Sequence, residues 1–263
     1  MKKLSLALAL FLMISVLAGC SPAVQDESAA STQNVATGAP TETETESESI
    51  DIFADVEPAE VPEVPEELFF QPLDYNRHLA TYVSDYFNVP HTLKELYDHK
   101  FVGNIVLCDV VSDIDEYAEY ESNTLNYTDV RVVSVIKGDF EVGDMVTICD
   151  EGHRNADGSD SIPDDGGPLL RKNMRVLLFT RPNLLETAPE IERPIKIKEG
   201  YKYTGLGAAP YISKIYIDEN NMAYPVASYI EATRDNPVWE CLDDFKKPVP
   251  LGKLIAVLES YAE

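Results

Sequence analysis

Short runs of β-forming residues recur along the chain from residue 102 onward. Loops rich in Asp, Gly and Pro separate them, as is typical of strands joined by turns. The runs cover residues 102–111, 127–136, 144–149, 174–180, 201–206 and 211–217. Several short strands with helical patterns at both ends predict a mainly β domain, built as a small barrel or sandwich.

Helices are expected on both sides of these runs. Apolar residues at helical spacing predict an amphipathic helix over residues 74–88, which Pro90 ends. Thr92 and Glu95 match a capping box, which predicts that a short helix follows at once. The pattern of a closing helix is carried by Leu251, Leu254, Ile255 and Leu258.

The stretch RVVSVIKGDFEVGDMVTI, residues 131–148, could be a phosphate-binding loop or the corner between two strands. A phosphate loop needs a helix after its glycine-rich turn, but β-forming residues resume at Met145. Gly138 favours a turn, so the stretch predicts a β-hairpin corner. The two-residue alternation slips near Val132 and Val133, which predicts a β-bulge there.

The N-terminus carries an export signal. Lys2 and Lys3 precede an apolar stretch at residues 4–17, which is too short for an ordinary membrane span. The motif LAGC, ending at Cys20, resembles a bacterial lipobox, whose cysteine receives a diacylglycerol thioether and becomes the new N-terminus. We therefore expect a signal peptide at residues 1–19 and a lipid attachment with palmitate-type acyl chains at Cys20. A plain secretory signal with a coincidental cysteine is the alternative.

The composition changes abruptly after Cys20. Residues 21–70 include TETETESES and ADVEPAEVPEVPEE and contain no lysine or arginine. Few large apolar groups, repeated prolines and one sign of charge cannot offset the entropy that a chain loses on ordering. We therefore expect a disordered acidic linker at residues 20–71 and a single globular domain at residues 72–263.

The cysteines leave the redox state open. Beyond Cys20 the chain contains Cys108, Cys149 and Cys241. An exported protein could pair two of them, yet Cys108 and Cys149 lie in apolar runs that are equally typical of buried thiols. No C-x-x-C or Cys/His ligand spacing occurs, so neither a structural zinc site nor a cofactor is predicted.

An acidic loop carries the candidate site residue His153. The loop DEGHRNADGSDSIPDDGG surrounds this histidine with carboxylates, and oxygen ligands on such a loop could hold calcium. Its spacing does not match an EF-hand, so calcium binding at residues 150–165 stays open. A second acidic loop, DIDEYAEYES at residues 113–122, carries Tyr117 and Tyr120 and could face a cationic or sugar partner. Spacing alone assigns no catalytic residue.

The order of several motifs, within residues 92–226, resembles a known domain type. The motifs are ELYDHKFVGNIVLCDVV, YTDVRVVSVIKGD, GDMVTICDEG, LLRKNMRVLLFT and YISKIYIDENNMAYP. They resemble an extracytoplasmic domain of many bacterial lipoproteins, which is similar to the barrel of tissue inhibitors of metalloproteinases. The resemblance implies an OB-like Greek-key barrel of five to six strands with flanking N- and C-terminal helices. Those inhibitors use a free N-terminal cysteine, whereas Cys20 is expected to be lipidated, so their mechanism does not carry over.

Two functions remain from these patterns. The first is a membrane-anchored lipoprotein on the extracytoplasmic side, which acts as a binding module at the cell envelope through loops 113–126 and 151–168. A net charge of −25 argues against nucleic acid and favours cationic peptides, proteins, wall polymers or divalent ions as partners. The alternative is an envelope hydrolase that uses His153 with acids of its loop. The binding module is preferred, because no motif requires an enzyme.

Overall fold

The computed structural model describes most of the chain after residue 50. Contacts divide the chain into the units Met1–Ser47 and Glu48–Glu263, and all described residues belong to the second unit. The predicted signal peptide, Cys20 and residues 21–50 of the predicted linker lie outside them. The described residues are 51–70, 78–79, 89–113, 116–120, 123–156, 158, 160–162, 167–184, 198–208, 211–226 and 242–263.

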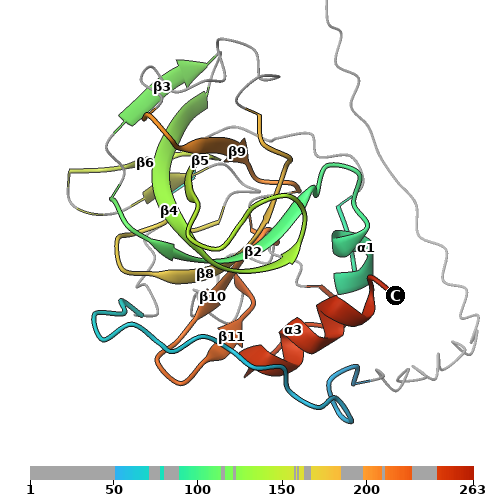
Figure 1. The fold of residues 1–263 in the computed structure, drawn as a ribbon. Helices are drawn as coiled ribbons and strands as arrows, with labels where there is room; N and C mark the ends of the chain where they lie inside the picture. The colour runs from blue at the N-terminus through green and yellow to red at the C-terminus, as the bar shows by residue number, and fades with distance from the viewer. Residues whose placement is uncertain are drawn as a thin grey trace, which may run out of the picture. The chain divides into compact units, whose positions relative to one another are not determined.

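A nine-stranded mixed sheet forms the body of the domain (Figure 1). Its strands follow the order β12-β11-β10-β8-β2-β4-β5-β9, and β3 pairs with β4 beside this path. The mainly β prediction is confirmed, but the sheet exceeds five or six strands because β11 and β12 extend one edge and β3 folds back on β4. The strands are β2 (Asn104–Val110), β3 (Glu116–Tyr120), β4 (Asn123–Lys137), β5 (Met145–Glu151), β8 (Arg175–Thr180), β9 (Lys202–Gly205), β10 (Lys214–Ile217), β11 (Met222–Tyr224) and β12 (Val249–Pro250).

Further backbone contacts join β9 to the end of β8. In the strand order, β9 is the last strand and β8 lies near the middle. Thr180 and Leu206 form an isolated antiparallel bridge. Three backbone hydrogen bonds flank the bridge: Leu184 N to Tyr203 O at 2.7 Å, Arg181 N to Gly205 O at 2.9 Å, and Gly207 N to Phe179 O at 2.9 Å. The parallel pair β5–β9 is thereby connected back to the strand that also pairs with β2.

A second, three-stranded sheet has the order β1-β7-β6. β1 (His78–Leu79) pairs in parallel with β7 (Asp160–Ile162), and β7 pairs antiparallel with β6 (His153–Arg154). The helix predicted for residues 74–88 is wrong at these two residues, because their backbone pairs with β7 and tertiary pairing overrides local helical pattern. The other residues of 74–88 lie outside the described part of the chain.

The predicted capping-box helix and closing helix are both confirmed. α1 (Leu93–Tyr97) begins after Thr92, whose Oγ1 accepts a hydrogen bond from Glu95 N at 3.1 Å. The Glu95 carboxylate accepts from His91 N at 2.7 Å, one residue before the partner that a capping box uses. α3 (Leu251–Ser260) buries the side chains that its spacing predicts: Leu251, Leu254, Ile255 and Leu258.

Residues 131–148 form the predicted hairpin corner, since β4 ends and β5 begins within them and the two strands pair antiparallel. The predicted bulge is also confirmed. The pairing of β4 with β2 shifts register between Leu107 and Cys108, which leaves Val133 without an opposite residue. A helix does not follow the glycine, so the corner is a turn and not a phosphate-binding loop.

Two side chains lock this corner. Asn104 Oδ1 accepts from Asp139 N at 2.8 Å, while its Nδ2 donates to Arg181 O at 2.9 Å. Gly138 has a φ of 101°, and a Cβ there would lie 2.1 Å from Asn104 Oδ1, so the corner requires glycine. Lys137 Nζ donates to Tyr97 O at 2.6 Å, at the end of α1. Burial lowers the pKa of Lys137 from its ordinary value.

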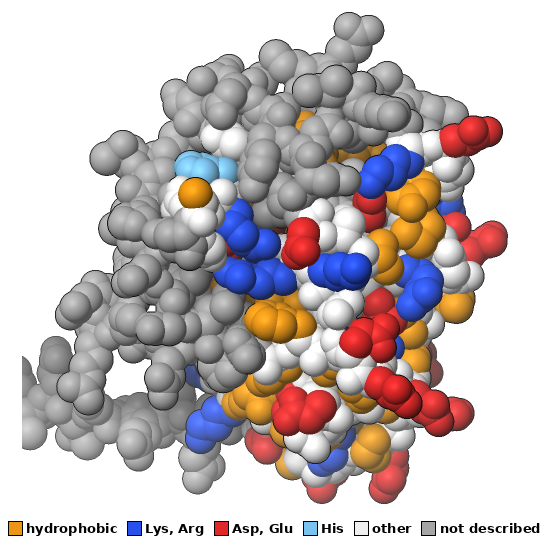
Figure 2. Space-filling view, turned by 90° about the vertical axis from the view of Figure 1, so that its left-hand side faces the viewer, with side chains coloured by type: hydrophobic (Ala, Val, Ile, Leu, Met, Phe, Trp, Pro, Cys, Tyr) orange, Lys and Arg blue, Asp and Glu red, His pale blue; other side chains and the backbone are white. Residues whose placement is uncertain are grey.

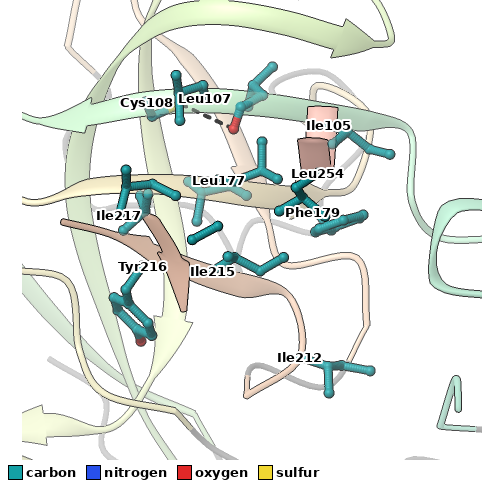
Figure 3. Packing of buried hydrophobic residues seen from close by; sticks show 14 of the residues in the cluster. Ile105, Leu107, Cys108, Leu177, Phe179, Ile212, Ile215, Tyr216, Ile217 and Leu254 are labelled. Carbon is teal, nitrogen blue, oxygen red and sulfur yellow. Dashed lines mark hydrogen bonds between the residues drawn. The ribbon is translucent and has the colours of Figure 1, made fainter. Parts of the chain in front are cut away.

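The main hydrophobic core joins the sheet to α3. Figure 3 shows side chains of β2, β8 and β10 packed together with Leu254 of α3. Leu177, Phe179 and Leu254 are fully buried, and each such side chain contributes about 1.5–3 kcal/mol to folding. The Cys108 thiol lies in the same cluster and donates to Val106 O at 4.0 Å. A second, small cluster consists of Leu125, Tyr127 and Tyr203.

Residues 51–70, which we call the strap, pack against the domain. Phe53 is 6% exposed, and its ring meets the edge of the Phe245 ring at a centroid distance of 6.0 Å. Ala59 N donates to Gly252 O at 3.0 Å. The prediction that this part of the chain is a disordered linker is therefore wrong, because contacts with the domain offset the entropy lost on ordering. The domain begins before residue 72.

Candidate functional site

Lys214 of β10 and Asp150 of β5 form an ion pair inside the domain. Their side chains are 0% and 2% exposed, and Nζ lies 2.5 Å from Oδ2. Nζ also donates to the backbone oxygens of Gly167 and Pro168, at 3.2 and 3.0 Å. The ammonium group thus has three acceptors, which offset much of the cost of burying its charge.

Polar side chains of β4 and β10 complete an interior polar cluster. We define this cluster as Asn126, Asp150, Lys214 and Tyr216. Tyr216 OH donates to Pro168 O at 3.0 Å, and Asn126, the cross-strand partner of Asp150, donates through Nδ2 to Gly152 O at 3.1 Å. Asn126 Oδ1 finds no hydrogen-bond partner among the described residues, and neither does Oγ1 of Thr128 on the same strand. The cluster is buried and its lysine is fully engaged, so it secures the fold and exposes no nucleophile.

Asp160 of β7 is the centre of a second charged group. Its side chain is fully buried, Arg154 Nε donates to Oδ1 at 2.9 Å, and Arg171 Nη2 lies 3.6 Å from the same oxygen. Oδ2 accepts from Leu169 N at 3.3 Å. Asp160 thus ties β6 to the segment that leads into β8, and its oxygens are occupied by nitrogen donors.

Described parts of the two segments predicted to contact a partner, 113–126 and 151–168, lie next to each other. Gly152 N donates to Thr124 O at 2.7 Å, and Arg154 Nη1 lies 3.9 Å from the largely exposed Asp113 carboxylate. We call the surface of these two segments the two-loop surface. On the side where Figure 1 places β3 and β6, Figure 2 shows lysine and arginine side chains gathered beside carboxylates. The pattern is that of a charged surface with both signs.

His153 lies on β6 opposite Ser161 of β7 and is half-buried. Two of the acids expected around it, Asp150 and Asp160, are instead paired with lysine or arginine. Within the described ranges, no group of three or more His, Cys, Asp or Glu side chains is placed to hold a metal ion. The remaining acids of this loop that lie outside the described residues are Asp157, Asp164 and Asp165.

Tyr117 and Tyr120 lie on a strand and not in a loop. β3 pairs antiparallel with β4, so that Tyr117 lies opposite Asn126 and Tyr120 opposite Asn123. The prediction of an acidic loop at residues 113–122 is therefore wrong for β3. Aromatic residues favour strands, and the long strand β4 supplies the partner that the composition of this segment does not reveal.

Cys108 and Cys149 do not form a disulfide with each other. They lie on β2 and β5, which β4 separates. Burial raises the pKa of the Cys108 thiol well above its ordinary value, and the neighbouring Asp109 carboxylate adds to the rise. Cys108 is thus an unreactive core residue. Cys241 lies outside the described residues.

The sequence patterns do not single out the Lys214–Asp150 pair, although each residue leaves a signal. Lys214 interrupts the apolar run YISKIYI, and Asp150 ends the run MVTICD. Lysine and aspartate are rarely buried without a partner, so a charge inside a predicted strand indicates a buried ion pair. The residue that supplies the opposite charge is 64 positions away and has no local signature.

No protein-family model, no curated protein and no solved structure matches this chain. The resemblance to the extracytoplasmic barrel domain therefore rests on the motifs of the chain alone. Its function has to be inferred from its own contacts.

Proposed function

We propose that this protein is a membrane-anchored extracytoplasmic lipoprotein whose domain binds a partner at the cell envelope. The observation that carries the proposal is the junction of segments 113–126 and 151–168, which Arg154 and Gly152 hold together. A surface that is fixed before its partner arrives loses little entropy on binding. The net charge of the chain is −25, so a cationic peptide, protein or wall polymer is the expected ligand.

An OB-like barrel is the body that we infer beneath this surface. β2, β4 and β5 form an antiparallel series, β5 pairs in parallel with β9, and β8 pairs with β2. The hydrogen bonds between residues 179–184 and 203–207 would close these strands into a ring in the order β2-β4-β5-β9-β8. Five strands in such a ring are consistent with an OB-fold and with the resemblance to the metalloproteinase-inhibitor barrel.

In such a barrel, the face that OB-folds use for oligonucleotides and oligosaccharides would be covered. That face belongs to the second and third strands, which would be β4 and β5 here. Tyr127 and Tyr203 on this side are each 1% exposed, and Leu184 packs against them. Asp129 of β4 is covered by an ion pair with Lys198. A partner would therefore contact the two-loop surface and not the strand face.

The anchor and the location depend on the N-terminal motif. Among the helices of the described residues, none is long and apolar enough to cross a membrane. A diacylglycerol supplies two acyl chains, which is enough for stable anchoring. Mass spectrometry of the natively produced protein tests this part: the expected N-terminus is Cys20 carrying diacylglycerol, and an unmodified N-terminus at another residue would contradict it.

Binding is tested with the lipid-free chain that begins at Ser21, immobilised and exposed to solubilised envelope. We expect saturable retention of one partner, and its loss when Tyr117→Ser and Tyr120→Ser are combined. Val142→Ser is the matched control, because Val142 is 70% exposed on a different hairpin. Retention that survives the tyrosine changes, or that the control abolishes equally, would refute the two-loop surface as the binding site.

The described residues give no support to the hydrolase alternative. A general base must lie within about 3 Å of the proton that it removes, and two described acids of this loop, Asp150 and Asp160, already serve as ion-pair partners. Turnover of an envelope ester or peptide that is lost in His153→Ala would nevertheless overturn the binding-module proposal.

A further inference from the structure

Four exposed glutamates of the strap follow one another at a period of three: Glu57, Glu60, Glu63 and Glu66. The other exposed acids of the strap, Asp51, Asp55 and Glu67, lie outside this period. The half-buried residues between the last three glutamates of the period are Val61, Pro62, Val64 and Pro65. A polyproline II helix has three residues per turn, so one side of it faces water at every third position. Residues 56–65 have no helix or strand hydrogen bonding, and their prolines restrict the backbone to extended conformations. This part of the strap therefore lies on the domain as a polyproline-type segment.

Arg175 holds the centre of this segment by its backbone. Its Nη1 donates to Pro62 O at 3.2 Å and to Glu63 O at 2.6 Å. The other side of the guanidinium is fixed by Asp109, with Nε at 2.8 Å from Oδ1 and Nη2 at 3.3 Å from Oδ2. The charged pair aims the remaining donor at two carbonyl groups. The contact thus recognises an extended backbone and not a particular side chain.

α3 approaches the strap so closely that residue 252 must be glycine. A Cβ on Gly252 would lie 2.6 Å from Ala59 O and 3.0 Å from Pro58 Cβ. Gly252 O accepts from Ala59 N at 3.0 Å, and the next residue, Lys253, donates through Nζ to Phe53 O at 2.8 Å. The start of α3 is therefore shaped to receive the backbone of this segment.

Aromatic contacts fix both ends of the strap. Phe53 lies against Phe245 at one end, and the Phe70 ring lies 4.9 Å from the Tyr224 ring at the other. Phe69 N donates to Asn173 O at 2.9 Å beside the second contact. Aromatic pairs of this kind add about 0.5–1.5 kcal/mol beyond the area that they bury. The two ends define the length of segment that the face accommodates.

We propose that this face is a recognition site for an extended, proline-containing peptide with aromatic ends, and that the strap is its occupant in the same chain. The face consists of Asn173, Arg175, Tyr224, Phe245, Gly252 and Lys253. Prolines set the extended backbone in advance, so such a peptide loses little entropy on binding. The glutamate side chains are exposed, so the site recognises the backbone and the prolines and not the acids. It is separate from the two-loop surface and does not depend on it.

The test uses the chain from Ser21 and a fluorescent synthetic peptide of residues 51–70. Phe53→Ser with Phe70→Ser loosens the resident strap and leaves the face intact. We expect the peptide to bind this loosened variant saturably in fluorescence anisotropy, and to bind the wild-type chain at least about tenfold more weakly because its site is filled. Adding Gly252→Ala to the loosened variant should weaken binding by about tenfold or more, since the new methyl group occupies the place of the peptide backbone.

Two altered peptides separate recognition of proline from attraction by charge. Replacing Pro62 and Pro65 by glycine should weaken binding about tenfold, whereas replacing Glu60 and Glu63 by glutamine should leave it unchanged. Equal binding of both altered peptides, or equal binding with and without Gly252→Ala, would overturn the proposal.

If the loosened variant does not fold, amide exchange in the wild-type chain provides the test. There, excess peptide should displace the strap and accelerate amide exchange at Ala59. Exchange that stays unchanged up to millimolar peptide would also overturn the proposal.

Discussion

Replacing Arg175 by lysine should destabilise the domain through loss of the fork that joins the strap to β2. The Arg175 side chain is 2% exposed and donates to Asp109 through two nitrogens and to two strap carbonyls through a third. Lysine keeps the charge but has one nitrogen, which cannot reach the carboxylate and the strap together.

The size of the loss follows from these contacts. A hydrogen bond from a charged donor contributes about 1.5–3 kcal/mol, and breaking a buried ion pair outright costs about 3–5 kcal/mol. Because Arg175→Lys preserves the charge opposite Asp109 and loses the strap contacts, we expect a loss of about 2–4 kcal/mol in the free energy of unfolding. Arg131 is the matched control: it lies 3.5 Å from the same Asp109 carboxylate, but its side chain is 55% exposed. Arg131→Lys should cost at most about 1 kcal/mol.

Urea unfolding measures the difference between the two variants, and amide exchange at Ala59 reports on the strap. Arg175→Lys should lower the unfolding midpoint and accelerate exchange at Ala59, whereas Arg131→Lys should do neither to a comparable extent. Equal midpoints for the two variants would show that Arg175 contributes only surface charge. An unchanged exchange rate at Ala59 in Arg175→Lys would show that the strap does not depend on this fork.

Three further outcomes are expected. Gly138→Ala should cost about 1–3 kcal/mol of stability and more than Gly143→Ala, because both have positive φ but only the first would place its Cβ against Asn104; urea unfolding compares them. Burial, together with nearby carboxylates, raises the pKa of Asp244, so its ionised form is disfavoured on folding; stability should therefore fall as pH rises from about 4 through the raised pKa, and Asp244→Asn should remove this part of the pH profile. An alkylating reagent should leave Cys108 unmodified in the folded protein, whereas Cys149, which is half-buried, reacts faster than Cys108; equal rates would contradict the buried position of Cys108.

Features that depend on neighbours in sequence could be predicted from this chain. The hairpin corner at Gly138, the bulge at Val133 and the cap at Thr92 are each decided within a few residues, by turn chemistry, alternation and side-chain hydrogen bonding. The strands were predictable because β-forming runs are bounded by turn residues. In contrast, the length of β4 depends on its pairing with β3. The acidic composition of β3 is typical of a loop, so this pairing could not be predicted.

The strap shows why composition alone misled the prediction of disorder. Acidic, proline-rich segments do not form a core of their own, and this reasoning holds for the strap in isolation. The glutamates at every third position and the aromatic ends were visible in the sequence. This pattern is typical of a polyproline II segment with one side exposed to solvent. What the sequence does not reveal is the receiving face, since Arg175 and Gly252 lie more than a hundred residues away from the strap carbonyls.

Three cations whose side chains are at most 17% exposed share one role in this acidic chain. Arg175, Lys214 and Arg154 each pair with a buried or nearly buried carboxylate, and each also donates to a backbone carbonyl of a segment outside the strands. The carbonyl groups of irregular segments have no neighbouring strand or helical turn that donates hydrogen bonds to them. These cations supply the donors instead. Buried pairs are screened little by salt, whereas contacts at an exposed charged surface are screened strongly. We therefore expect raising the salt concentration to leave the urea midpoint nearly unchanged while it weakens retention of a cationic partner. A midpoint that falls with salt as steeply as partner retention would mean that the ion pairs are solvated, and that they do not hold the irregular segments in place.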